Sequence, residues 1–422
     1  MLNMQTPKPA YFFVLFLFTG CTQLSPLHPN SSAKPQNSIQ ADKDCRLAFI
    51  EFGEQGSYQD TSQLQNAIDL IQRTPQPLII TYVHGWQNNA VSGDVEKFGG
   101  LLARLNRAPV IRARGFNVIG VYLGWRGRMS NLPVVKEFSF YNRKAAAERI
   151  ASNFDCFDAI AAISEAARKY HRSDGQYTIL LGHSFGGLIV ERAVAHAVNA
   201  EMHGHAEAER SLPADLILTV NPASDSILSR QMIAALYSRH TEDSRPFMVS
   251  ITSSADLATG LAFPVGTSLA ATSKAFNNVV VPGPDERPES ERRFYTSTPG
   301  HNELLINHVT EKMSKTIRSP QGLPALETNL AHNLAAEVFT LDGPDGMLEL
   351  WKMKPVGNVD VPYWDVKVDP SIIKNHGDLW NERAEAMMAA IFRMANPKLG
   401  PTKPRAVLQK APDPARMPKR SN

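Results

Sequence analysis

Ser184 is the residue whose surroundings point most clearly to chemistry. It lies in Gly182-His183-Ser184-Phe185-Gly186, with a glycine two positions before it and another two positions after it. The apolar run Tyr177–Leu181 precedes this stretch and Leu188–Val194 follows it, which predicts a strand, a sharp turn and a helix. In that context the motif is typical of a nucleophile elbow, which lifts a serine hydroxyl above the edge of a sheet. The glycines suit the crowded turn because they lack a Cβ atom.

A reactive serine also needs N–H donors for the oxyanion that forms during acyl transfer. His84-Gly85-Trp86 follows the apolar segment 77–83, so it is expected at the end of a strand. We expect the backbone N–H groups of Trp86 and Phe185 to form the oxyanion hole, each lowering the barrier by about 3 kcal/mol. His84 is expected to hydrogen-bond the loop rather than to transfer protons.

Two acids follow predicted strands after the serine. Asp256 comes just after the segment 247–252, and Asp225 comes after the segment 216–220. The usual chain order of serine, acid and histidine favours Asp256 as the acid that orients the base. Asp225 stays open as an alternative, and either acid could instead cap a helix.

Two histidines compete for the role of base. His376 lies in the loop that joins the last predicted strand to the last predicted helix, whereas His301 lies in a segment rich in proline and glycine. The position after the last strand favours His376, and His301 stays open. The histidine and cysteine spacings fit no metal-binding motif, so the sequence predicts neither a metal nor a cofactor.

The elements that must position these residues alternate between apolar strands and helices. This alternation predicts an α/β fold with a doubly wound, mostly parallel sheet covered by helices on both faces. The predicted domain spans residues 46–395, and its longest predicted helix spans 143–170. The segment at about 257–345 breaks the alternation and is expected to be a lid-like insertion.

The residues around Ser184, Asp256, His376 and His84-Gly85-Trp86 resemble the α/β-hydrolase superfamily. The stretches 82–86, 120–127, 182–187 and 253–259 are similar to a poorly characterised esterase/lipase-like branch. This resemblance implies hydrolysis of a small-molecule or lipid ester through an acyl-serine intermediate, without a cofactor. A peptidase, thioesterase or acyltransferase that uses the same triad is an alternative, as is a non-catalytic hydrolase-fold binding lipoprotein.

The N-terminus is typical of an export signal. Lys8 precedes the apolar run 11–18, which is too short to span a bilayer. Phe18-Thr19-Gly20-Cys21 resembles the bacterial lipobox, in which the cysteine is lipidated after cleavage. The sequence therefore predicts a signal peptide over 1–20, a lipid-anchored flexible tether over 21–45, and export to the outer membrane, facing the periplasm or the exterior. An ordinary secretory signal that is cleaved nearby stays open as an alternative.

Charge and cysteine content complete the picture. The chain has a net charge of +3, and the segment 396–422, which has seven basic residues and one acidic residue, is predicted to be a disordered basic tail. The rest of the chain is therefore slightly acidic, which argues against a nucleic-acid partner. Besides Cys21 the chain has Cys45 and Cys156, and an oxidising compartment would permit a disulfide between them.

Overall fold

The computed structural model describes residues 25–395, with gaps at 43, 129–132, 171–176, 203–212, 238–245, 283–286, 313–334, 344–345 and 354–360. The predicted signal peptide at 1–20, the predicted lipidation site at Cys21 and the predicted basic tail at 396–422 lie outside the described residues. In the part of the chain that is described, no helix is both long enough and apolar enough to cross a membrane.

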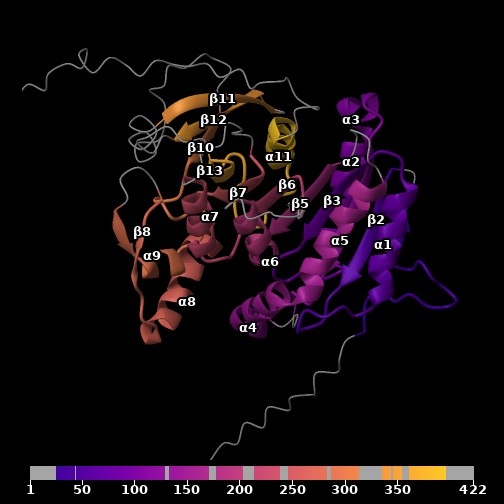
Figure 1. Cartoon of the computed structure of the whole chain (residues 1–422), viewed down its shortest axis with the longest axis horizontal. Helices are drawn as coiled ribbons and strands as arrows, with labels where there is room; N and C mark the ends of the chain where they lie inside the picture. The colour runs from indigo at the N-terminus through magenta and orange to yellow at the C-terminus, as the bar shows by residue number, and fades with distance from the viewer. Residues whose placement is uncertain are drawn as a thin grey trace, which may run out of the picture.

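The described residues build one eleven-stranded sheet, in the order β1-β2-β4-β3-β5-β6-β7-β13-β10-β12-β11 (Figure 1). The eight strands from β2 to β10 in this order are parallel, and β1, β12 and β11 are antiparallel to their neighbours. The strands are β1 (Ile39–Ala41), β2 (Arg46–Glu51), β3 (Pro77–Val83), β4 (Asn117–Gly124), β5 (Tyr177–His183), β6 (Leu216–Val220), β7 (Met248–Ser253), β10 (His308–Lys312), β11 (Ala335–Gly343), β12 (Gly346–Met353) and β13 (Tyr363–Val368). The predicted α/β class with a mostly parallel sheet is therefore confirmed.

Helices cover both faces of this sheet, and each face has its own apolar core. The helices on one face are α1 (Thr61–Arg73), α4 (Pro133–Ser152), α5 (Phe154–Tyr170), α6 (Phe185–Met202) and α7 (Ile227–Tyr237). Those on the other face are α2 (Gly93–Arg107), α3 (Pro109–Ala113) and α11 (Glu382–Ala395). Because both faces are covered, the central strands β3 and β5 are almost entirely buried, which is why most of their residues are apolar.

The single long helix predicted over 143–170 is in fact two helices that meet at Asn153. The Asn153 side chain accepts a hydrogen bond from the backbone N–H of Asp155 at 2.9 Å, as an N-cap does, and donates one to the backbone carbonyl of Gln55. Because the Asn153 side chain caps the start of α5, α4 ends at Ser152 and the two helices are separate.

The segment predicted as a lid-like insertion divides into two parts. Its first part contains the π-helical turn η1 (Ala258–Ala262), α8 (Phe263–Ala270), the short helix η2 (Ala271–Ser273), the hairpin β8 (Asn278–Val280) and β9 (Pro288–Ser290), and α9 (Glu291–Tyr295), all outside the main sheet. Its second part enters the sheet, because β10 pairs with β13 and with β12. The predicted boundary at about 345 is therefore wrong, and the excursion from the sheet ends before His308 (Figure 1).

The flexible tether predicted over 21–45 is wrong for its described part. The backbone N–H groups of Leu27 and His28 donate to the Glu51 carboxylate at 2.8 and 2.9 Å, and the His28 ring stacks on Phe49 with centroids 3.8 Å apart. Further along, β1 pairs with the edge strand β2. Burial alone would raise the pKa of Glu51, but the hydrogen bonds that its carboxylate accepts from His28 and Leu27 hold this pKa below its ordinary value. The polar composition of this segment is typical of a flexible linker, so the sequence does not indicate that the segment covers the edge strand β2.

The possible disulfide between Cys45 and Cys156 is wrong, because both residues are free thiols in the structure. Cys156 belongs to α5 and is buried in the core on one face of the sheet, whereas Cys45 packs against the core on the opposite face, close to Gly99 of α2. The sheet separates the two sulfur atoms, and a disulfide needs Cα atoms no more than about 7 Å apart.

Candidate functional site

Ser184 occupies a strained turn between β5 and α6. Its φ is +57°, in the left-handed region that residues with a side chain rarely adopt, at a cost of about 1–3 kcal/mol. A Cβ on Gly182 would lie 2.7 Å from the carbonyl oxygen of Gly186, and a Cβ on Gly186 would overlap the backbone at the end of β3. The two glycines therefore let the turn approach the neighbouring strand, as the motif predicts for a nucleophile elbow.

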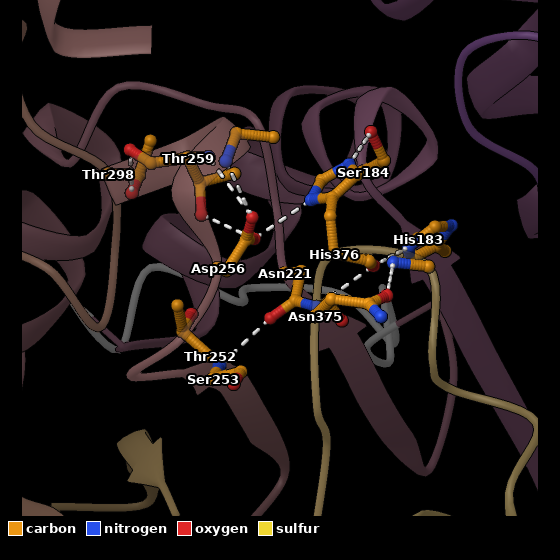
Figure 2. A network of polar contacts seen from close by, with 12 residues as sticks. His183, Ser184, Asn221, Thr252, Ser253, Asp256, Thr259, Thr298, Asn375 and His376 are labelled. Atoms are coloured by element: carbon orange, nitrogen blue, oxygen red, sulfur yellow. Dashed lines mark hydrogen bonds and ion pairs between the residues drawn. The ribbon is translucent and has the colours of Figure 1, made fainter. Parts of the chain in front are cut away.

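Three side chains from distant parts of the sequence form a hydrogen-bonded row at this turn (Figure 2). The Ser184 hydroxyl lies 2.7 Å from His376 Nε2, and His376 Nδ1 lies 2.8 Å from Asp256 Oδ2. Since the carboxylate can only accept, Nδ1 carries the proton and Nε2 is free to accept the serine proton. Ser184 follows β5, Asp256 follows β7 and His376 lies between β13 and α11, so all three are at carboxyl ends of parallel strands.

Asp256 is fixed by the residues that follow it. Its Oδ2 accepts from the Thr259 hydroxyl at 2.5 Å and its Oδ1 from the Ala258 backbone N–H at 2.9 Å (Figure 2). Burial raises the pKa of Asp256, but the hydrogen bond and charge of His376 and the bonds from Thr259 outweigh it, so the pKa is below the ordinary value. A charged carboxylate in this position can orient an imidazole and stabilise its protonated form.

The loop after β3 packs directly against the elbow. A Cβ on Gly85 would lie 2.6 Å from Ser184 Cβ, so only glycine fits there. The backbone N–H of Trp86 has no protein acceptor among the described residues. The backbone N–H of Phe185, the first residue of α6, has no acceptor within its own helix. The two backbone N–H groups that the sequence predicts for an oxyanion hole are thus not taken up by hydrogen bonds of the secondary structure.

His84 takes the structural role expected of it. Its Nε2 accepts from the backbone N–H of Trp125 at 3.1 Å, so its Nδ1 carries the proton and donates to the carbonyl of Gly85 at 2.9 Å. The ring is completely buried and stacks on the Trp125 ring. Burial lowers the pKa of His84, which keeps the ring neutral. Both nitrogens are occupied in shaping the loop.

The structure does not bring the alternative acid and base to Ser184. The Asp225 carboxylate binds Arg192 at 2.8 Å, and His301 packs against Gly260 after Asp256. Burial lowers the pKa of His301. Neither residue hydrogen-bonds the serine hydroxyl or His376.

Sequence reasoning missed three polar residues that support the row: Thr259, His183 and Asn221. Thr259 binds Asp256, whereas His183 and Asn221 both donate to the backbone carbonyl of His376. His183 stands within the elbow motif and Asn221 directly follows β6. For His183 and Asn221, the signal in the sequence is a polar residue at the end of a buried strand.

The described residues contain no cluster of three or more histidine, cysteine or acidic side chains arranged to hold a metal ion. Comparison with known protein families gives no match, and no curated protein matches either. Phospholipase PlaB from Legionella pneumophila is a solved structure with weak similarity, at 13% identity and a TM-score of 0.33 over 76% of this chain. The complex of PlaB with thio-NAD has 13% identity and a TM-score of 0.26 over 67% of this chain. The matched region spans 61% and 50% of those two chains.

Proposed function

We propose that the protein is a serine hydrolase that cleaves carboxylic esters through an acyl-serine intermediate. The observation that carries this proposal is the row of contacts from Ser184 Oγ to His376 Nε2 and from His376 Nδ1 to Asp256. This order of nucleophile, base and orienting acid is what nucleophilic acyl transfer requires.

In the first half-reaction, His376 Nε2 takes the hydroxyl proton while Ser184 Oγ attacks the carbonyl carbon of the ester. The carbonyl oxygen becomes an oxyanion, which the backbone N–H groups of Trp86 and Phe185 would stabilise by about 3 kcal/mol each. When this intermediate collapses, the bond to the alcohol oxygen breaks and His376 returns its proton to the leaving alkoxide. Asp256 stabilises the imidazolium between these two proton transfers.

In the second half-reaction a water molecule replaces the alcohol. His376 takes a proton from the water, whose oxygen attacks the acyl carbon and forms a second oxyanion. Collapse releases the carboxylic acid, and the proton on His376 returns to Ser184 Oγ. The net reaction consumes one ester and one water and yields one acid and one alcohol, without a redox step.

Two apolar features support a substrate with an acyl chain. Phe140 of α4 packs on both Trp86 and Phe185, at ring centroid distances of 5.4 and 5.0 Å. An aromatic ring therefore lies against the two residues whose backbone N–H groups are the proposed oxyanion donors. The second feature begins directly after Asp256. Its members are apolar, spaced four residues apart and each more than half exposed, and we call them the α8 stripe: Leu257, Leu261, Val265 and Leu269.

The α8 stripe supports a lid-like role for the part of the excursion that carries it. The seventeen residues from Leu257 to Ser273 include no charged side chain. Helix α8 lies beside α4, where Gly266 packs against the ring of Tyr141, itself 55% exposed. Exposed apolar surface of this kind is typical of a site that contacts lipid or another apolar partner. We therefore propose lipid esters as the substrate class.

A fluorophosphonate probe tests the nucleophile directly, because it reacts only with an activated serine. The wild-type protein should be labelled, and Ser184→Ala should not be labelled. Hydrolysis of p-nitrophenyl esters should be lost in the same variant. Loss of an essential nucleophile usually costs about 10⁶-fold in kcat, so the residual rate should approach that of buffer.

The control for this experiment is Ser254→Ala, which changes a serine outside the hydrogen-bonded row. It should be labelled like the wild type. Equal labelling of the wild type and Ser184→Ala would contradict the assignment of the nucleophile. A folded wild-type protein that neither reacts with the probe nor hydrolyses any ester would indicate a non-catalytic binding protein.

A further inference from the structure

The backbone carbonyl of His376 receives two hydrogen bonds from side chains outside its own loop. His183 Nε2 lies 2.7 Å from this oxygen, and Asn221 Nδ2 lies 3.0 Å from it (Figure 2). His183 is the last residue of β5 and directly precedes Ser184, while Asn221 directly follows β6. The loop that carries the imidazole is thus attached to two central strands of the sheet.

In this contact His183 can act only as the hydrogen-bond donor. A carbonyl oxygen only accepts, so Nε2 must carry the proton and donate it. The ring is buried, and burial, together with the nearby His376, lowers the pKa of His183 to about 4. His183 is therefore neutral at neutral pH. Its Nδ1 is buried without a hydrogen-bond partner among the described residues, so the ring has no second group to relay a proton to.

Asn221 uses both ends of its amide. Its Oδ1 accepts from the backbone N–H of Ser253 at 2.9 Å, while its Nδ2 donates to the carbonyl of His376. The donor at one end and the acceptor at the other fix which atom is oxygen and which is nitrogen. Its φ of +46° lies in the left-handed region, where asparagine is better tolerated than most residues. The amide joins the ends of β6 and β7 to the loop of His376.

We infer that His183 and Asn221 are positioning residues that hold the His376 loop so that the imidazole reaches Ser184 and Asp256 together. This inference rests on the proposed hydrolase function. The His376 side chain is 26% exposed at the surface, and the described contacts that hold its backbone carbonyl come from these two residues. A displacement of about 1 Å at a reacting group can lower the rate about 100-fold, so two hydrogen bonds that fix the position of His376 can have a large effect on the reaction.

Two substitutions of His183 separate positioning from packing. His183→Gln keeps an N–H donor at about the reach of Nε2, whereas His183→Leu keeps the volume and removes the donor. With a soluble ester, His183→Leu should lower kcat about 10- to 100-fold with little change in KM, because the substrate still binds. His183→Gln should recover most of that loss. Asn221→Leu should also lower kcat, and its free energy of unfolding should fall as well, because leucine is strained at this left-handed backbone and leaves the Ser253 N–H without its acceptor.

His308→Leu is the matched control, since His308 is also a buried histidine of the sheet, stacked on Trp364. Its free energy of unfolding is expected to fall, and its kcat should not. Wild-type kcat in a folded His183→Leu protein would overturn the inference. So would equal losses in His183→Leu and His183→Gln, because the imidazole itself would then be needed.

A measurement without substrate keeps this inference distinct from the proposed function. The proton shared by His376 Nδ1 and Asp256 should give a downfield NMR signal in the wild type. The signal should persist in His183→Gln and disappear or broaden in folded His183→Leu. If the signal persists in His183→Gln and is lost in His183→Leu, but the wild-type protein hydrolyses no ester, the positioning role stands and the proposed activity fails. If it stays unchanged in His183→Leu, the positioning role fails.

Discussion

At the scale of single residues, hydrogen bonds distinguish side chains that the sequence leaves nearly equivalent. Asp256 and Asp225 both follow strands, yet only Asp256 contacts His376, which lies 120 positions further along the chain. Asp225 instead binds Arg192. Residue types at strand ends were enough to predict Ser184, Asp256 and His376 as candidates. Spacing could not predict His183 and Asn221 as their supports, because these act through a backbone carbonyl that any residue possesses.

Replacing Asp256 with asparagine should lower kcat about 10³- to 10⁴-fold, because an amide cannot stabilise the imidazolium and favours the wrong tautomer of His376. The pKa of Asp256 is already below its ordinary value, so the carboxylate is charged throughout the neutral range. Asp225→Asn also removes one carboxylate and should leave kcat nearly unchanged. Steady-state kinetics of both variants, with unfolding curves to verify folding, make the comparison. A similar loss in the two variants would contradict the assignment of Asp256.

At the scale of elements, the sequence predicts strands well where both faces are covered and poorly at one edge of the sheet. The continuous apolar runs of β3, β4 and β5 reflect burial on both sides. By contrast, Val309 is the single apolar residue among the five positions of β10, and β10 pairs with strands that come later in the chain. A short, polar segment of this kind does not show the apolar pattern of a strand, so the sequence predicts an insertion there instead.

The α8 stripe gives a prediction about the physical state of the substrate. A double substitution, Leu261→Gln with Leu269→Gln, should reduce hydrolysis of a long-chain ester in lipid vesicles at least about tenfold. The reason is that each leucine transferred from water to lipid contributes about 1.5–3 kcal/mol. The rate with a soluble short-chain ester should not change, because neither leucine contacts the hydrogen-bonded row. Parallel assays with the two substrates measure this difference.

Phe154→Gln is the control for the stripe. Phe154 is 72% exposed, but it begins α5 and lies outside the stripe. It should leave both activities at the wild-type level. An equal loss of vesicle activity in this variant would show a general effect of surface hydrophobicity, and unchanged vesicle activity in the double variant would exclude a role for the stripe.

At the scale of the whole molecule, the carboxyl groups of Glu191 and Asp365 are completely buried and have raised pKa values. Burial raises the pKa of Glu191 in α6 to about 8, although hydrogen bonds from Ser224 and Thr219 oppose the rise. Burial likewise raises the pKa of Asp365 in β13 to about 7, opposed only by the backbone N–H of Gly300. Both groups bind a proton more tightly in the folded state than in the unfolded chain. Folding is therefore favoured at low pH by these groups.

Asp365 should make the protein less stable as the pH rises. Its contribution to the free energy of unfolding is most favourable below the unfolded pKa near 3.8 and is lost as the pH rises to about 7. Asp365→Asn should therefore raise the urea midpoint relative to the wild type, and this difference should grow between pH 4 and pH 8. Glu303→Gln, which removes an exposed carboxylate, is the control and should show no such pH-dependent difference. A difference between Asp365→Asn and the wild type that does not grow over this range would contradict this account.

The contact between Glu51 and the backbone of Leu27 and His28 changes how far the folded domain can travel from Cys21. A flexible segment from Cys21 to Arg46 would have a contour length of about 85 Å, at roughly 3.4 Å per residue. With the chain fixed at Leu27, only five residues lie between it and Cys21, so the Cα atoms of these two residues are at most about 21 Å apart. If Cys21 carries lipid, as its sequence predicts, the folded domain is held within one small-protein diameter of its own bilayer. Its range of action would then be that membrane's surface rather than the surrounding volume.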